Sequence, residues 1–171
     1  MFHTNRIVIF LAFAICISSL FHLTHGEHIF MVKGNVYCDI CRVQLITKTA
    51  KFIQGAKVRL ECKNRKSGAI TFTADAETNK DGEYQIKVYG EHLQKDELCE
   101  MIPIFSPDPN CNEISRDPSV RKANQITLAE LKGMSSNTRT VTSIGFLTKK
   151  VPPECDEILK KTSVTAFGLV P

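Results

Sequence analysis

Cys38 and Cys41 are the residues whose spacing most directly suggests chemistry, because they form a C-x-x-C within the stretch NVYCDICRVQL. Such a pair can be half of a zinc site, a redox centre, or the ends of two separate structural disulfides. A zinc site needs two further ligands at a matching spacing, and the sequence holds no second C-x-x-C and no H-x-x-x-H. A redox centre needs its first cysteine at a helix N-terminus, whereas the residues after Cys41 show no N-cap and many β-branched side chains. The spacing therefore favours two cysteines with different partners.

The first 26 residues have the layout of a secretory signal peptide. Arg6 precedes an apolar run over 7–17, and Thr24 and Gly26 supply the small residues that a signal peptidase needs before its cut. A membrane anchor is the alternative, but a spanning helix needs about 20 apolar residues and this run is shorter. We predict a signal peptide over 1–26, which leaves a secreted chain without a membrane span in the extracellular space or apoplast.

Cleavage after Gly26 would make the number of cysteines even, because Cys16 leaves with the signal peptide and six of the seven cysteines remain. Six cysteines in a secreted chain predict three disulfides, with fifteen possible connectivities. The remaining residues, 27–171, suit a single domain. The net charge falls from +4 to +3, because Arg6 is the only charged residue removed. Such mild basicity does not indicate a nucleic-acid partner.

The elements that must position these cysteines have the hydrophobic pattern of β-strands. In GAKVRLECK, residues 55–63, four apolar side chains alternate with charged ones, which is typical of a half-buried antiparallel strand. These four are Ala56, Val58, Leu60 and Cys62. Further strands are expected within residues 31–38, 69–75, 83–89, 97–105 and 138–150, and residues 125–132 fit either a strand or one helical turn. The fold class we predict is all-β: a disulfide-stapled antiparallel β-sandwich or partly closed β-barrel of about seven strands.

Several positions within these strands carry specific expectations. Ile70 and Phe72 should continue the inward face of the preceding strand. Gly82 should close a turn through a positive φ, and Pro103 should restrict its strand to an edge or a bulge because it has no N–H. Tyr84, Ile86 and Val88 should also face inward.

Two segments of the chain are expected to lack regular structure. Residues 106–124 contain three prolines and few apolar side chains, which predicts a long loop tied down near its start by Cys111. The domain core is expected over 32–155, and the residues after Cys155, 156–171, are expected to form a flexible tail.

The sequence contains no recognised catalytic motif. It has no G-x-S-x-G, no H-E-x-x-H and no glycine-rich phosphate loop. His28 and His92 are the only histidines after the predicted cleavage site, and neither sits in a catalytic pattern. We therefore predict a protein that is not an enzyme and has no catalytic residues, no cofactor and no metal. A glycan-acting enzyme with paired carboxylates stays open as an alternative.

A cluster of five basic residues follows one predicted strand face and the turn after it, although Glu61 lies among them. One interpretation is a solvated strand whose charges prevent edge pairing. The other is a docking patch for an acidic partner such as pectin. The five residues are Lys57, Arg59, Lys63, Arg65 and Lys66.

Five stretches together resemble a known family. They are VKGNVYCDICRV, IQGAKVRLECKN, TNKDGEYQIKVYG, LCEMIPIFSPDPNC and SIGFLTKKVPPEC, in this order between Val32 and Cys155. In order and spacing they resemble the plant pollen proteins related to the major olive pollen allergen, the Ole e I-like family. The resemblance implies a secreted, disulfide-bonded β-barrel or sandwich. It also implies a disulfide pairing, which on this chain would be Cys38 with Cys111, Cys41 with Cys155, and Cys62 with Cys99.

The same resemblance implies a function but no catalytic residue. Members look like extracellular plant proteins, some of which act in pollen hydration, germination and tube growth and bind receptor-kinase ectodomains. We therefore expect a non-enzymatic binding or signalling role in the apoplast or cell wall, in pollen-tube or tissue growth, through an extracellular protein such as a receptor-kinase ectodomain. Association with the wall polysaccharide pectin is the alternative partner. The chain has no N-x-[ST] sequon, so N-glycosylation is not expected.

Overall fold

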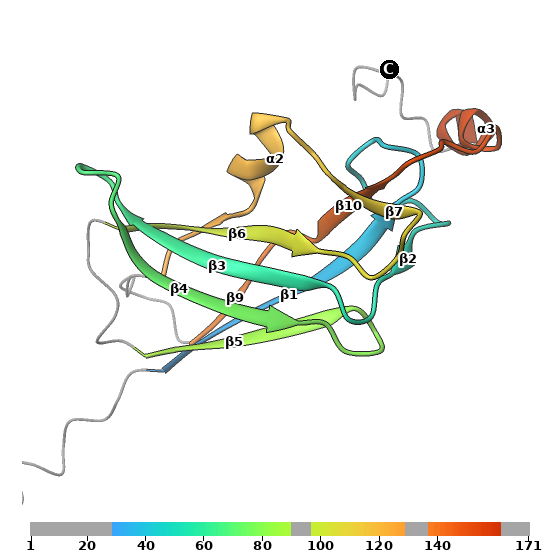
Figure 1. Cartoon of the computed structure of the whole chain (residues 1–171). Helices are drawn as coiled ribbons and strands as arrows, with labels where there is room; N and C mark the ends of the chain where they lie inside the picture. The colour runs from blue at the N-terminus through green and yellow to red at the C-terminus, as the bar shows by residue number, and fades with distance from the viewer. Residues whose placement is uncertain (1–28, 90–96, 129–136, 162–171) are drawn as a thin grey trace, which may run out of the picture.

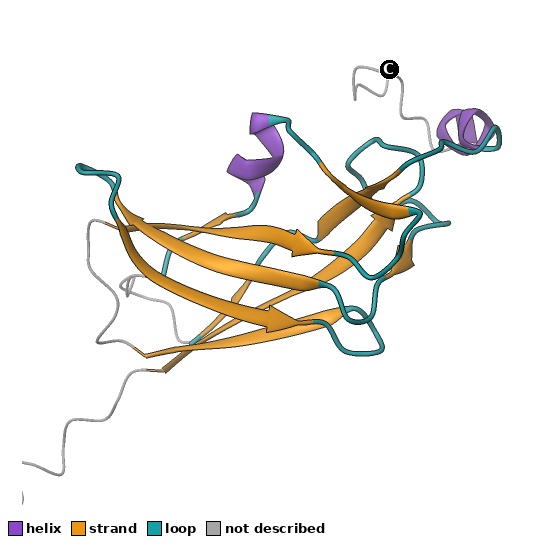
Figure 2. Cartoon of the chain, in the orientation of Figure 1, coloured by secondary structure: helices purple, strands orange, loops and turns teal. Residues whose placement is uncertain are grey.

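The computed structural model describes residues 29–89, 97–128 and 137–161, and its strands form two facing sheets (Figures 1 and 2). The described strands do not close into a barrel, so the predicted all-β sandwich is confirmed. The large sheet contains β1 (Ile29–Asp39), β2 (Lys51–Phe52), β5 (Glu83–Tyr89), β7 (Cys111–Ile114), β9 (Thr138–Thr140) and β10 (Ile144–Thr148). The small sheet contains β3 (Lys57–Asn64), β4 (Ile70–Glu77), β6 (Glu97–Phe105) and β8 (Gln125–Ile126). The described residues thus hold ten strands rather than about seven, because β2, β8 and β9 are only two or three residues long.

Strand β1 is the centre of the large sheet. Its first half pairs with β5 and β9, and its second half pairs with β2 and β10. The sandwich is mainly antiparallel, as predicted, but β9 and β10 both run parallel to β1. Parallel strands need a long crossover connection, and here the chain forms the whole small sheet between β1 and β9.

The core lies between the sheets and follows the predicted alternation. Val58, Leu60 and Cys62 of β3 are all 0% exposed, and so is Ala56, which comes directly before the strand. From the large sheet, β5 contributes the side chains that were expected to face inward, and all three are buried. These are Tyr84, Ile86 and Val88.

Ile70 is a correction to the predicted pattern, because 58% of it is exposed. The pairing of β3 with β4 shifts after Cys62, which lies opposite Phe72, so that Ile70 lies opposite Lys63. A bulge of this kind puts two residues opposite one and reverses the alternation of side chains. Ile70 therefore shares the outward face of Lys63, whereas Phe72 packs against the core as predicted.

Pro103 lies at the second irregularity of the small sheet. The pairing of β6 with β3 shifts between Lys57 and Val58, and Pro103 is the partner of Val58. A residue without an N–H is tolerated at such a bulge, so this expectation is confirmed.

Residues 106–124 were predicted as a loop, and that prediction is wrong for two segments. Strand β7 pairs with β10, and helix α2 (Pro118–Ala123) lies beside β6. The helix begins at Asp117, whose side chain accepts a hydrogen bond from the N–H of Ser119, and Pro118 occupies its first turn. Asp-Pro-Ser is a helix-start signal that the sequence contains.

The expected flexible tail begins with helix α3 (Cys155–Lys161) instead of irregular chain. Its first residue is joined to Cys41, which anchors the helix to the end of β1. The predicted signal peptide, His28, His92 and residues 162–171 lie outside the described residues. Within the described part of the chain, no helix is long and apolar enough to cross a membrane.

The six cysteines form three disulfides. Cys38 and Cys41 leave in different directions, as the spacing predicted: one reaches β7 and the other reaches α3. The third bond joins β3 to β6 at directly paired residues. The pairs are the same as those that the family resemblance implies: Cys38–Cys111, Cys41–Cys155 and Cys62–Cys99.

A substitution at Gly82 can test how the β4–β5 turn is packed. It has a φ of 71°, and a Cβ atom there would lie 2.7 Å from Phe52 Cβ and 2.8 Å from the carbonyl oxygen of Val36. Gly68 has the same φ but no atom within 4 Å of such a Cβ. We expect Gly68→Ala to lower the free energy of unfolding by about 1–2 kcal/mol through the backbone alone, and Gly82→Ala to lower it by clearly more. Guanidinium denaturation with intact disulfides would measure this, and equal losses would contradict the packing at Gly82.

The disulfide pairing gives a second prediction. Peptide mapping of the protein under non-reducing conditions should recover a linked pair containing Cys62 and Cys99, with no free thiol among the six cysteines. A bond between Cys38 and Cys41 would contradict the separate pairing and would reopen a redox role for the C-x-x-C.

Candidate binding site

The predicted basic cluster lies on the outward face of β3 and in the turn after it, but acidic side chains accompany it. The guanidinium of Arg59 binds the carboxylate of Asp75 on β4 through two hydrogen bonds of 2.6 and 2.9 Å. The hydrogen bond and charge of Asp75 raise the pKa of Arg59, and Arg59 lowers the pKa of Asp75. This residue pair is internally balanced in charge.

The positive charge of Lys63 is likewise balanced by neighbouring carboxylates. Its Nζ lies 2.7 Å from Glu61 Oε1 and 3.7 Å from Glu100 Oε1, and Glu100 also pairs with Arg121 of helix α2. The hydrogen bond that Lys63 donates to Glu61 is the main reason that the pKa of Lys63 is raised.

The remaining three members of the cluster are exposed, and the charge of Lys57 also helps to lower the pKa of Asp75. Lys57 is exposed at the start of β3. Arg65 donates to the carbonyl oxygen of Glu97 at 3.3 Å, and Lys66 is exposed in the same turn. The five residues therefore share one side of the small sheet but do not form a continuous basic surface, because Glu61, Asp75 and Glu100 lie between them.

A second group of residues, which the sequence did not indicate as a site, surrounds the end of β1. Asp39 is the last residue of β1 and is 1% exposed. Its carboxylate accepts hydrogen bonds from the backbone N–H groups of Val43 at 3.2 Å and Gln44 at 2.5 Å. These bonds fold the β1–β2 loop, residues 40–50, back over the strand end.

The β1–β2 loop is strained at two positions. Arg42 and Gln44 have φ values of 56° and 60°, in the left-handed region that L-residues with side chains rarely adopt. Such outliers persist only where the surroundings determine the conformation, and they are concentrated at functional sites.

Contacts from three sides hold this conformation. Arg42 Nη1 donates to the carbonyl oxygen of Thr148 at 2.5 Å and pairs with Glu113 Oε2 at 2.6 Å. Gln44 Nε2 donates to Ser115 Oγ at 3.2 Å. The two disulfides that start from Cys38 and Cys41 hold the loop to β7 and α3. In Figure 1, β2, β7, β10 and α3 lie toward the same end of the molecule.

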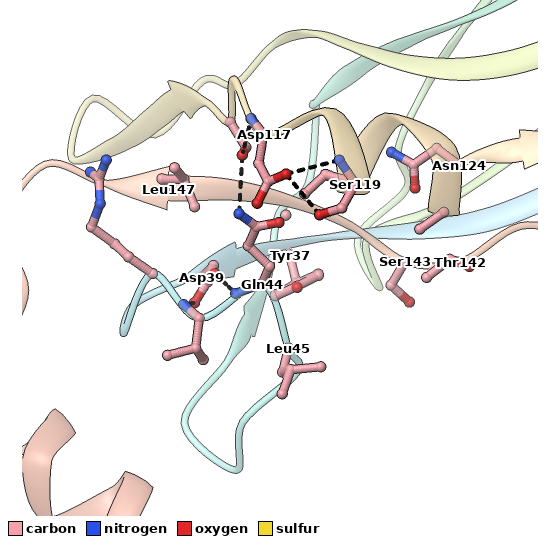
Figure 3. A pocket seen from close by; sticks show the side chains of 16 residues that line it. Tyr37, Asp39, Gln44, Leu45, Asp117, Ser119, Asn124, Thr142, Ser143 and Leu147 are labelled. Atoms are coloured by element: carbon pink, nitrogen blue, oxygen red, sulfur yellow. Dashed lines mark hydrogen bonds between the residues drawn. The ribbon is translucent and has the colours of Figure 1, made fainter. Parts of the chain in front are cut away.

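The loop borders a pocket of about 440 Å³, shown in Figure 3. Its walls come from the β1–β2 loop, from residues 115–124 around helix α2, and from residues 142–147 at β10. Tyr37 and Asp39 add the outward face of β1. The pocket thus lies outside the sandwich core, on the large sheet.

Tyr37 occupies the pocket because a glycine faces it. It lies opposite Gly145 on β10, and a Cβ atom at Gly145 would be 3.0 Å from the phenol oxygen. Tyr37 is 2% exposed. Burial, together with the negative charge of Asp39, raises the pKa of Tyr37 to about 12, so the phenol is neutral at physiological pH.

Asp117, at the N-terminus of helix α2, also has hydrogen-bond partners within the protein. Asp117 Oδ1 accepts from the backbone N–H of Ser119 at 2.8 Å and lies 2.7 Å from its hydroxyl. These bonds lower the pKa of Asp117. The pocket can therefore offer hydrogen bonds from hydroxyl and amide groups, while its carboxylates already accept hydrogen bonds from backbone N–H groups.

Comparison with known proteins supports the resemblance seen in the sequence. Residues 28–163 match the family described as "Pollen protein Ole e 1 like". An "Olee1-like protein" of Betula pendula is 42% identical over 95% of this chain and 97% of its own length. The "Pollen allergen Sal k 5.0101" of Kali turgidum is 42% identical over 80% of this chain and 89% of its own. Among solved structures, the "Major Plantain Pollen Allergen Pla l 1" is 28% identical, with a TM-score of 0.63, over 74% of this chain and 99% of that chain.

The buried phenol predicts a pH effect with a defined sign. Between the ordinary tyrosine pKa of 10 and the raised value of about 12, the unfolded chain loses the Tyr37 proton while the folded chain keeps it. The folded state then binds more protons, so the free energy of unfolding falls as pH rises through this window. Tyr37→Phe should flatten the fall, and denaturation at a series of alkaline pH values would show it. Identical pH profiles for the two proteins would contradict the burial of this phenol.

Proposed function

The chain belongs to the Pollen protein Ole e 1 like family, and we propose that it is a secreted, non-enzymatic protein that binds an extracellular protein partner through its β1–β2 loop. The partner class we propose is a receptor-kinase ectodomain, and the setting is the apoplast or cell wall during pollen-tube or tissue growth.

Three disulfides in a domain of this size support an extracellular location. Disulfides form and persist in oxidising compartments and are rare in the cytosol. The names of relatives point to the reproductive tissue of plants: one is an "Anther-specific protein" of Solanum lycopersicum, 34% identical over 92% of each chain. These names refer to those proteins, and for this chain the tissue is part of the proposal.

The single observation that carries the proposal is the conformation of the β1–β2 loop. The strained backbone at Arg42 and Gln44 is held by side-chain bonds and disulfides, yet Leu45 and Ile46 beside it are each 52% exposed. Apolar side chains presented on a rigid loop lose little conformational entropy on binding, so they are suited to recognition. Ile114 of β7, one residue before the Ser115 that binds this loop, is 46% exposed and can extend the contact.

Pectin is the second candidate partner. Lys57, Arg65 and Lys66 are exposed, and a polyanion could contact them. The ion pairs of Arg59 and Lys63 reduce the charge available on the same face. Exposed charges are screened within about 8 Å at physiological salt, so any pectin retention should be weak and should vanish as salt is added.

A variant of the loop tests the proposed function. Leu45→Asp combined with Ile46→Asp places charges where apolar anchors should enter the partner. Against a panel of purified receptor-kinase ectodomains in surface plasmon resonance, the double variant should bind at least about tenfold more weakly, the equivalent of about 1.4 kcal/mol. Ile70→Asp is the matched control, because Ile70 is equally apolar and exposed but lies in the small sheet.

Two outcomes would contradict the proposal. If the loop variant bound every recognised ectodomain as tightly as the wild type, the β1–β2 loop would not be the contact surface. If the reduced and alkylated chain bound as well as the folded one, recognition would not depend on the fold at all.

A further inference from the structure

Strand β4 lies at one edge of the small sheet and is eight residues long (Figure 1). The order of the strands in this sheet is β4-β3-β6-β8, so within the described residues β4 pairs with β3 alone. The other side of an edge strand offers backbone N–H and C=O groups to any extended chain that can align with it. The free side of β4 is therefore a surface on which another strand could pair.

The backbone groups that face this free side follow from the pairing of β4 with β3. The N–H of Thr78 donates to the carbonyl oxygen of Ala56 at 2.9 Å, and these two residues continue the β3–β4 register. Hydrogen-bonded pairs alternate along antiparallel strands, so Ala76 and Ala74 also bond to β3. The residues that alternate with them turn their N–H and C=O groups away from β3. These residues are Thr73, Asp75 and Glu77.

Two other long strands with an unpaired side carry features that prevent edge pairing, and β4 lacks these features. On β6, the N–H of Met101 faces away from β3 and donates to the carbonyl oxygen of Asn124. Pro103 follows two residues later on the same side, and it has no N–H to present there. On β5, an exposed lysine, Lys87, lies on the strand that pairs only with β1. Prolines and lysines of this kind protect edges, and β4 contains neither.

The two acidic side chains of β4 lie next to cations of β3. Asp75 accepts the two hydrogen bonds of 2.6 and 2.9 Å from Arg59, and Glu77 lies directly opposite Lys57 in the register. These cations reduce the repulsion that the acids would exert on a neighbouring strand. They also leave a basic peptide with little uncompensated acid to bind, so charge does not favour such a peptide as the occupant of this edge.

We propose that the free edge of β4 pairs with β4 of a second copy of this chain, antiparallel and about a two-fold axis at Ala74. In this register Asp75 of one copy lies opposite Thr73 of the other, so each carboxylate meets a hydroxyl rather than another carboxylate. Phe72 lies opposite Ala76, which matches a large side chain with a small one. The same strand thus supplies both halves of the contact, as the isologous interface of a two-fold dimer requires.

The neighbouring registers fit less well. An axis at Asp75 would place two carboxylates directly opposite each other, which is unfavourable. An axis at Thr73 would place Glu77 opposite residue 69, which lies before the start of β4, and would shorten the pairing. The contact is confined to the small sheet and leaves the β1–β2 loop of the large sheet available. It therefore goes beyond the proposed receptor contact and does not depend on it.

The test uses the whole protein with its disulfides intact. Sedimentation velocity over a dilution series should show a reversible equilibrium between monomer and dimer, because one pair of edges buries less area than a standard interface. Amide exchange measured at low and high protein concentration locates the contact. The amides of Thr73 and Asp75 should exchange at least about tenfold more slowly in the dimer, whereas that of Ala74, which already bonds to β3, should change little.

Thr73→Pro removes an N–H that β3 does not use, and it should weaken dimerisation at least about tenfold. Gln85→Pro is the matched control on β5. Gln85 lies opposite Lys33, whose carbonyl oxygen accepts from Val141, so the N–H of Gln85 also points away from β1. This control variant should dimerise as the wild type does.

Three results would overturn the proposal. The first is a wild-type protein that stays monomeric at every concentration. The second is a dimer in which exchange at Thr73 and Asp75 is the same as in the monomer, because its contact would lie elsewhere. The third is a folded Thr73→Pro variant that dimerises as tightly as the wild type. The exchange measurement on the wild type decides the question even if the proline variant does not fold.

Discussion

The buried carboxylate of Asp39 is the contact on which the end of the molecule around α2, β7 and α3 depends. A carboxylate that is removed from water is unfavourable unless hydrogen bonds satisfy its oxygens. Here the N–H groups of Val43 and Gln44 do so, and they can reach Asp39 only because the backbone turns through positive φ at Arg42 and Gln44. One buried charge at the end of β1 thus determines the path of the residues that follow it.

That path has two consequences. It presents Leu45 and Ile46 to solvent next to a backbone that is held by hydrogen bonds and two disulfides. It also forms a wall of the pocket, which Leu45 helps to line and whose other walls are α2 and β10. The charged face of the small sheet shows the opposite arrangement, because its cations are balanced by neighbouring acids such as Asp75 and Glu100. The charges of Arg59 and Lys63 are therefore balanced within the small sheet, whereas the β1–β2 loop presents exposed apolar side chains.

The sequence was most informative where a single pattern dominates the local structure. The alternation from Ala56 to Cys62 predicted the inward face of β3 because period two and charge coincide there. The outward position of Ile70 could not be predicted from the sequence, because the bulge opposite Lys63 depends on how β3 and β4 pair. The balance of Arg59 by Asp75 likewise depends on a register that only strand pairing defines.

The pocket could not be predicted from the sequence for the same reason. Its parts come from segments more than 70 residues apart, such as Gln44 and Ser115, and no spacing rule connects them. Two local signals were nevertheless present. An acidic residue between Cys38 and Cys41 could have indicated a carboxylate drawn into a constrained turn, and Asp-Pro-Ser at 117–119 could have located helix α2 within the expected loop.

Amide hydrogen exchange at Val43 and Gln44 tests the role of Asp39 most directly. Both residues lie in a loop, where exposed amides exchange freely, but their N–H groups are bound to a buried carboxylate. These two amides should exchange as slowly as those of β1, and Asp39→Asn should speed both by at least about tenfold while the amides of β3 stay unchanged. Exchange of Val43 and Gln44 at exposed-loop rates in the wild-type protein would contradict the central role of this carboxylate.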